Sequence, residues 1–242
     1  SHLKSLNPRS VDFLFLEANF DNRPEGKKTD LKKTPYADWM IEIFNLWFHD
    51  KEKPFKIRLF ETYMLAIFGL SFGLDTVGNS KNEILVIEAD GGIEPVGSLK
   101  VCGHGFTKVG ANVHTHTLDD ALQTKLATLY HNSGKNLCST CKKCPIKEVC
   151  GAGYLPHRYS KINGFDNPSV YCSDLMKLIT HIQNQLYESF PKKIRRKIPI
   201  EPLTFRQLKE YMKPYVDLHH TSKTKKLNYS NNWNDKKKAV YI

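Results

Sequence analysis

The feature that most constrains this chain is a group of closely spaced cysteines. Five of the six cysteines fall within 35 residues, with the spacing C-x2-C-x2-C-x5-C-x21-C. They are Cys138, Cys141, Cys144, Cys150 and Cys172. Two sulfurs separated by two residues can turn back on one centre, but three in such a run cannot all pair with each other as unstrained disulfides. The spacing is therefore typical of a metal site.

The donor set narrows the choice of metal. Cysteine alone supplies the ligands, because no histidine stands at matching spacing, and a cysteine-only set favours an iron–sulfur cluster. Four cysteines are also a common structural zinc site, so zinc is an alternative, and disulfides or free thiols are a third. Spacing alone does not choose four ligands among five candidates. The sixth cysteine, Cys102, is a further candidate ligand.

Length and composition indicate a globular protein of one large or two small domains. The chain has 242 residues, of which 40% are hydrophobic and 11% aromatic, enough to bury a core. No secretion signal follows Ser1, and the longest apolar stretch, residues 63–74, is too short and too rich in glycine to span a bilayer. With cysteines of a metal-binding type, this predicts a cytoplasmic protein with no membrane partner.

The net charge of +11 is concentrated near the C-terminus. From Pro191 onward there are 14 Lys or Arg residues against four acidic ones, so the first 190 residues are close to neutral. Such a run is most often a solvated, partly disordered tail, and the alternative is a surface for nucleic acid or an acidic partner. If the cysteines bind zinc and the basic segment is a binding surface, the chain would be a module that interacts with nucleic acid or with another protein. Few aromatics stand among the lysines, so nucleic acid is not the partner that we expect.

Periodicity predicts a mixture of helices and strands. Residues 11–17 are mostly apolar, as in a buried parallel strand, and residues 83–96 have the glycine turn of a β-hairpin. Helices are predicted from Pro35 with Thr34 as its cap, over 57–68 with Gly69 after it, from Leu118 through Tyr130, and from Ser173 through Leu186. Both element types in one chain indicate an α/β fold.

The cysteine segment resembles a known family. Residues 138–186 are similar to the auxiliary-cluster (SPASM) region of radical SAM peptide maturases. The stretch from Cys150-Gly-Ala-Gly-Tyr-Leu-Pro-His157-Arg158 to Tyr171-Cys172 is especially similar to the cyclophane-forming maturases of ribosomally made peptides. Pro35-Tyr-Ala-Asp-Trp39, the turn around Asp90-Gly91 and Ser98-Leu-Lys100 extend the resemblance over roughly residues 11–190.

The resemblance implies a fold and an activity. Residues 1–78 would be the C-terminal part of a partial (β/α) barrel, and residues 79–190 a SPASM-type auxiliary iron–sulfur domain with a β-hairpin and helices. Residues 191–242 would be a basic extension. The implied reaction joins side chains of a ribosomally made precursor peptide through a carbon–carbon bond. The implied cofactors are a 4Fe–4S cluster and, in the complete enzyme, S-adenosylmethionine.

The resemblance also assigns cluster ligands. It implies Cys141, Cys144, Cys150 and Cys172 around one 4Fe–4S cluster, with Cys138 able to replace one of them. A second auxiliary cluster needs cysteines where Tyr154 and Val96 stand, which makes a second complete cluster doubtful.

The family's catalytic cluster has no counterpart in this sequence. Radical SAM enzymes hold that cluster with C-x3-C-x2-C, and no such triplet occurs here. The chain is therefore expected to be inactive alone and to depend on an N-terminal half in the same protein or in a separate chain. The catalytic residues stay unknown.

Four further residues are candidates to contact the cluster or the peptide. His157 and Arg158 follow the cysteines and are candidates to donate hydrogen bonds to cluster sulfurs or to a peptide carboxylate; the alternative is a structural Arg158 paired with Asp166. Asn19 and Asp21 follow the predicted strand, where barrel active sites assemble, and are candidates to contact the peptide. Their alternative role is turn formation.

Overall fold

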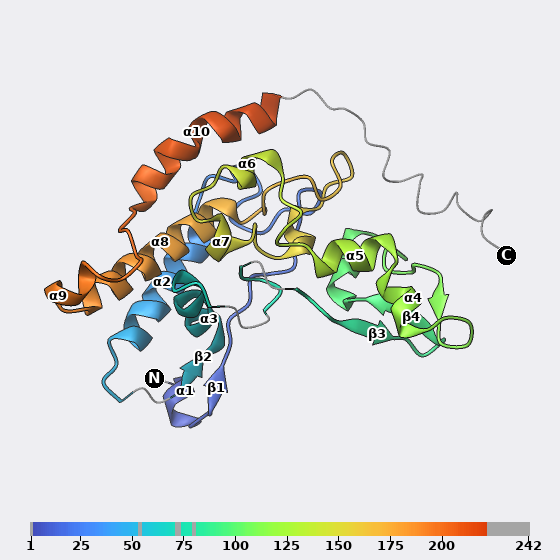
Figure 1. Ribbon diagram of the computed structural model, residues 1–242, viewed down its shortest axis with the longest axis horizontal. Helices are drawn as coiled ribbons and strands as arrows, with labels where there is room; N and C mark the ends of the chain where they lie inside the picture. The colour runs from blue at the N-terminus through green and yellow to red at the C-terminus, as the bar shows by residue number, and fades with distance from the viewer. Residues whose placement is uncertain (1, 53–54, 71–73, 79–80, 222–242) are drawn as a thin grey trace.

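The computed structural model describes residues 2–52, 55–70, 74–78 and 81–221, with side chains up to residue 215. Helices predominate, with two small sheets among them (Figure 1). In chain order the elements are α1 (His2–Ser5), β1 (Ser10–Val11), α2 (Pro35–Phe48), β2 (Lys56–Ile57), α3 (Arg58–Ile67), β3 (Leu85–Ile87), β4 (Gly92–Pro95), the 3-10 helix η1 (Gly97–Cys102), β5 (Ala111–Asn112), α4 (Leu118–Leu122), α5 (Lys125–His131), α6 (Ser139–Lys142), α7 (Lys147–Cys150), the 3-10 helix η2 (Leu155–Arg158), α8 (Cys172–Ser189), α9 (Lys192–Arg195) and α10 (Phe205–Thr221).

The strand predicted over 11–17 forms only at its start. β1 pairs in parallel with β2, with Ser10 opposite Lys56 and Val11 opposite Ile57. Residues 12–17 belong to no strand, because no other described segment pairs with them. Leu14 and Leu16 on this segment are 72% and 57% exposed. The parallel direction was predicted correctly, and the extent of the strand was not.

The predicted β-hairpin is confirmed. β3 and β4 are antiparallel, with Val86 opposite Glu94, and Gly91 in the turn has φ 78°. β5 adds a third strand beside β4. α4 and α5 pack against β4, so these elements form a group of their own on the right of Figure 1. The single helix predicted from Leu118 is divided in two, because Thr124 starts a second helix after α4 ends.

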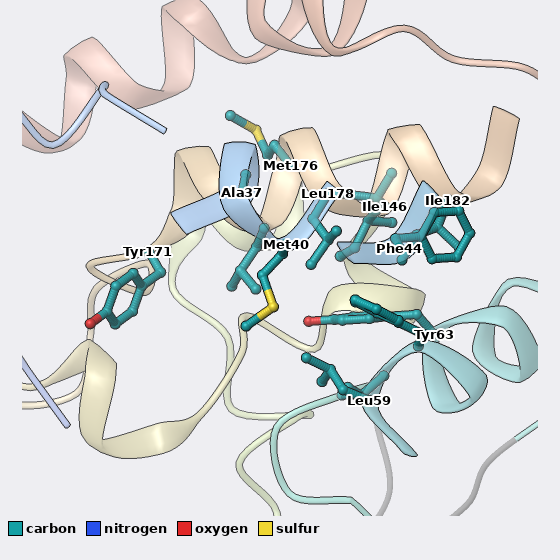
Figure 2. Packing of buried hydrophobic residues seen from close by; sticks show 14 of the residues in the cluster. Ala37, Met40, Phe44, Leu59, Tyr63, Ile146, Tyr171, Met176, Leu178 and Ile182 are labelled. Atoms are coloured by element: carbon teal, nitrogen blue, oxygen red, sulfur yellow. The ribbon is translucent and has the colours of Figure 1, made fainter. Parts of the chain in front are cut away.

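The main core lies between α2, α3 and α8. Figure 2 shows Met40 and Phe44 of α2 facing Leu178 and Ile182 of α8, with Tyr63 of α3 beside them. The apolar spacing that predicted the helix from Ser173 is confirmed by α8, whose inward residues are buried. The prediction for α3 is also confirmed, since Gly69 follows it with φ 77°.

A buried ion pair joins the N-terminal loop to this core. Lys27 and Asp174 are both 0% exposed, and the Lys27 ammonium donates to an Asp174 carboxylate oxygen and to the Lys33 carbonyl. Asp174 also accepts hydrogen bonds from the backbone N–H groups of Tyr36 (3.1 Å) and Ala37 (3.0 Å). The first turn of α2 is thus capped by a carboxylate from α8 rather than by the predicted cap, Thr34, whose side chain makes no capping bond.

The first part of the basic extension is folded onto the core. Leu208 and Met212 of α10 are buried in the main core cluster. The Thr140 hydroxyl donates to the Tyr215 carbonyl at 3.1 Å, so α10 lies against α6 (Figure 1). The solvated tail that we predicted therefore does not begin at Pro191, and the lysine run 236–238 lies outside the described residues. No helix in the described ranges combines the length and the apolar character needed to cross a bilayer.

Candidate metal centre

Short helical turns place the five clustered cysteines. Cys138 is the N-cap of α6, Cys141 lies within α6, and Cys144 follows its end. Cys150 is the last residue of α7, and Cys172 is the first residue of α8. None of these cysteines is in a disulfide. Each sulfur is therefore carried by the end of a helix or the turn beside it.

Four of the cysteines surround one small cavity. Cys141, Cys144, Cys150 and Cys172 line a space of about 20 Å³, whose remaining walls are mainly apolar. Those walls include Ile146, Ala152, Leu175, Met176 and Met212. No three Cys, His, Asp or Glu side chains in the described ranges are arranged to hold a single ion. The four cysteines thus border a space rather than converge on one point.

The two remaining cysteines have different surroundings. Cys138 is not among the residues that line the cavity, but the Cys141 thiol donates a hydrogen bond to its sulfur, which lowers the pKa of Cys138 and raises that of Cys141. Cys102 lies at the end of η1 in a separate apolar cluster with Leu99 and Tyr130. The structure therefore groups Cys138 with the four, and Cys102 apart from them.

Burial governs the chemistry of the sulfurs. Burial, with a smaller contribution from the nearby Cys144 sulfur, raises the pKa of Cys150 to about 12. Burial likewise raises the pKa of Cys172 well above its ordinary value, with Cys150 and Cys144 adding to the effect. Several thiolates together in such a site need a compensating cation, so a metal that binds here must release protons.

A left-handed turn follows Cys150. Gly151, Ala152 and Gly153 have φ of 57°, 60° and 65°, a run that only glycine adopts without strain. At Gly151 a Cβ would stand 1.8 Å from the Gly78 carbonyl oxygen, so the chain there admits no side chain. The Cys-Gly-Ala-Gly sequence thus serves to turn the backbone sharply beside the cavity.

Arg158 binds the inside of that turn. It is 1% exposed, and its guanidinium donates to the carbonyl oxygens of Gly151, Ala152 (3.2 Å) and Gly153 (2.8 Å). It also donates to the carbonyls of Ser133 (2.8 Å) and Asn136 (3.4 Å), just before Cys138. The Arg158 side chain thus links the backbone just before Cys138 to the backbone just after Cys150 through hydrogen bonds.

The alternative that paired Arg158 with Asp166 is wrong. Asp166 is exposed, and no carboxylate among the described residues forms an ion pair with Arg158. The buried cation faces the cysteines instead: Cys141, Cys150 and Cys138 each raise the pKa of Arg158, against the larger lowering by burial. Arg158 therefore sits where it can offset the charge of bound thiolates.

His157 lies outside the lining of the cysteine cavity. It lines a second cavity of about 240 Å³, between the 13–17 segment, α3 and η2. It is 5% exposed, its ring packs edge-on against Tyr154 and Tyr171, and its Nε2 has no hydrogen-bond partner. His157 is not among the residues that line the cysteine cavity, and its hydrogen bond to a cluster sulfur or a peptide carboxylate stays a prediction.

Stability should fall in mild acid because of His157. Burial lowers the pKa of its imidazole to about 4, against 6.5 when it is exposed. The folded state therefore binds fewer protons, and its stability is complete above about pH 6.5 and falls as the pH drops toward 4. Between pH 7.5 and 5.0 we expect a loss of about 2 kcal/mol, measured by urea unfolding. In His157→Gln that part of the pH dependence should disappear, whereas His114→Gln, at an exposed site, should leave it intact.

The side chains of Asn19 and Asp21 both accept hydrogen bonds from backbone N–H groups of loops. The Asn19 side-chain oxygen accepts from the backbone N–H groups of Asp21 (3.0 Å) and Asn22 (2.8 Å), and its amide donates to Val101. An Asp21 carboxylate oxygen accepts from the backbone N–H of Lys161 at 2.9 Å. Asn19 thus forms the turn of its own loop, as the alternative interpretation predicts, whereas Asp21 joins this loop to the segment at Lys161; contact with a peptide stays a prediction for both.

Comparison with known proteins gives a match in structure only. No protein-family model matches the sequence, and no curated protein does. Solved structures of anSMEcpe, an anaerobic sulfatase-maturating radical SAM enzyme, do match. The structure with bound AdoMet and Kp18Cys peptide has a TM-score of 0.59 and 18% identity, over 81% of this chain and 52% of that one. The native structure with bound AdoMet has a TM-score of 0.60 and 19% identity, over 77% and 50%.

The likeness concerns the fold. At 18–19% identity it shows that this chain has a mixed α/β fold similar to that of anSMEcpe. The chain spans about half the length of the structures that it matches.

Proposed function

We propose that this chain is the C-terminal part of a radical SAM peptide maturase, and that its clustered cysteines hold a 4Fe–4S cluster. The observation that carries the proposal is the placement of Cys141, Cys144, Cys150 and Cys172 around one cavity. This placement occurs in a fold similar to that of a radical SAM enzyme whose structure contains a peptide.

The residues fit a cluster in three respects. The donors are four thiols, the ligands that iron–sulfur clusters use. The other walls are largely apolar, which limits access of water. Arg158 supplies a buried positive charge beside the sulfurs. Four thiols also serve as a structural zinc site, so the metal content of the protein decides between the two.

The roles of the parts follow from this assignment. A bound cluster would supply a site for electron transfer. The chain's own residues bury it, exclude water and fix the helix ends that carry the thiolates. With no C-x3-C-x2-C in the sequence, cleavage of S-adenosylmethionine belongs to an N-terminal half, in the same protein or in a partner chain. We assign no step of that reaction to residues of this chain.

The substrate that we propose is a ribosomally made precursor peptide. The support is the peptide in the matching anSMEcpe structure, together with the similarity of the Cys150–Cys172 stretch to cyclophane-forming maturases. The reaction would join an aromatic side chain to a second residue of that peptide through a carbon–carbon bond, as in those enzymes.

Iron content of cysteine variants tests the metal assignment. Anaerobically reconstituted wild-type protein should be brown and contain about four irons and four sulfides per chain. Cys150→Ala and Cys172→Ala should retain less than half of that iron, because each removes a ligand on the cavity wall.

Two matched variants sharpen this experiment. Cys102→Ala alters a buried cysteine in a separate cluster and should keep the iron of the wild type. Cys138→Ala removes the hydrogen-bond partner of Cys141 but no sulfur that lines the cavity, so it should keep more iron than Cys150→Ala. Equal iron in all four variants would refute the ligand set, and a colourless wild-type protein with one zinc would refute the cluster.

A further inference from the structure

The second cavity, which His157 lines, has the chemistry of a binding site for a cationic side chain. Its walls are aromatic, including Phe13, Phe15, Tyr154 and Tyr171, and its volume is about 240 Å³. Two acidic residues, Glu17 and Asp75, also line it, and no Lys or Arg among the described residues does so. We propose that this cavity binds the lysine or arginine side chain of a peptide, its charged end between Glu17, Asp75 and the His157 ring.

The unpaired nitrogen of His157 is the first observation in favour. Its Nε2 is buried without any hydrogen-bond partner, which is rare in folded proteins and costly unless a ligand supplies the partner. Burial lowers the pKa of the His157 imidazole, so at neutral pH the ring carries one N–H donor and one acceptor nitrogen. When Nε2 is the acceptor, a ligand there brings an N–H or O–H donor, and ammonium and guanidinium groups bring several.

The carboxylates of Asp75 and Glu17 favour a cationic ligand in this cavity over a neutral hydrogen-bond donor. Asp75 is half-buried, with one oxygen accepting from the Tyr130 hydroxyl at 2.7 Å, and burial raises the pKa of its carboxyl. A cation in the cavity would offset that cost. Glu17 is exposed and marks, with Leu14, the side on which the cavity opens.

The aromatic walls favour the same ligand. The faces of phenyl and phenol rings attract a desolvated cation, and they also cover the methylene stem of a lysine or arginine. Tyr154 and Tyr171 are held in place, Tyr171 by a hydrogen bond from its hydroxyl to Leu16 (2.9 Å) and Tyr154 by one to the Ser98 hydroxyl. The cavity is thus built of fixed rings rather than of loose side chains.

The inference rests on the proposed function only in taking the ligand to be part of a peptide, because none of the candidate metal ligands lines this cavity. Binding is measured by ligand-observed NMR titration of the whole chain, with its iron content recorded in parallel. The probes are blocked tripeptides with a central arginine, lysine, norleucine or tryptophan between glycines.

The arginine and lysine probes should bind about tenfold or more tightly than the norleucine probe in wild-type protein at low salt. That preference should shrink at least threefold in Glu17→Gln, which alters an exposed residue and should fold normally, and should also decrease in Asp75→Asn. Glu42→Gln, an exposed residue of α2 outside the cavity, should keep the full preference.

Three results would overturn the inference: equal binding of norleucine and arginine, tighter binding of tryptophan than of arginine, or an unchanged preference in Glu17→Gln. Absence of iron together with a retained preference for arginine would overturn the proposed cluster and leave this cavity assignment standing.

Discussion

Replacing Arg158 with methionine should cost the fold at least about 4 kcal/mol and most of the bound iron. The substitution keeps an unbranched side chain but removes hydrogen bonds to the carbonyls of Gly151, Ala152, Gly153 and Ser133, all on buried or half-buried backbone. Each unsatisfied buried carbonyl costs about 1–3 kcal/mol, and partial relaxation makes the sum smaller than the separate costs. Urea unfolding and iron analysis of the same samples measure both effects.

Arg158→Lys separates charge from hydrogen bonding. A lysine keeps the positive charge, but it cannot reproduce the planar fork that reaches several carbonyls at once. We expect this variant to lose stability yet to keep more iron than Arg158→Met, and Arg196→Met, on an exposed arginine, to behave as wild type. No carboxylate in the described part of the chain pairs with Arg158, so the thiolates of a bound cluster would be the negative charges beside it. The stability that Arg158→Met loses should therefore be larger in iron-loaded than in iron-free protein. Equal losses in both forms would remove the argument that Arg158 balances the thiolates.

The second large effect is expected at the buried ion pair of Lys27 and Asp174. Asp174→Asn leaves the Lys27 ammonium buried without a counter-charge, which typically costs 3–5 kcal/mol. Asparagine still offers an oxygen to the N–H groups of Tyr36 and Ala37, so the cap of α2 should persist and the loss should come from the charge. Urea unfolding at pH 7.5 measures it.

A double variant isolates the charge effect. Lys27→Met with Asp174→Asn should be less destabilised than the sum of the two single variants, because no unpaired charge then remains. The partly exposed pair of Asp38 and Lys177 gives the matched control: Asp38→Asn should cost less than about 1 kcal/mol. A loss in Asp174→Asn no larger than in Asp38→Asn would contradict this assignment.

Local patterns predicted those features that depend on neighbouring residues. The apolar spacing from Leu175 to Leu186 identified α8, the glycine turn identified the hairpin, and Gly69 marked the end of α3. The cysteine spacing, read with the family resemblance, picked out the four residues that border the cavity. Except for Cys172, which follows Cys150 after 21 intervening residues, the signal and the structure lie close together in the sequence.

Features that depend on distant partners were missed. The strand over 11–17 needed a pairing neighbour that the described chain does not provide. Nothing in a polar loop marks Lys27 as buried, because its partner Asp174 stands 147 residues away. Met212 reaches the cysteine cavity from α10, in a segment whose lysine and arginine content suggested a solvated tail or a charged binding surface. Arg158 was recognised as a candidate, but its carbonyl partners follow from the left-handed turn at 151–153, which its own position in the sequence does not reveal.

The position of Cys172 as the first residue of α8 has a practical consequence. The same helix carries a candidate ligand at its start and the central apolar contacts of the core along its length. Detachment of iron and melting of the helix should then be one event, so the visible absorbance of a reconstituted sample would bleach at the temperature at which its far-ultraviolet ellipticity is lost. Colour alone would serve as an optical gauge of folding during purification and storage.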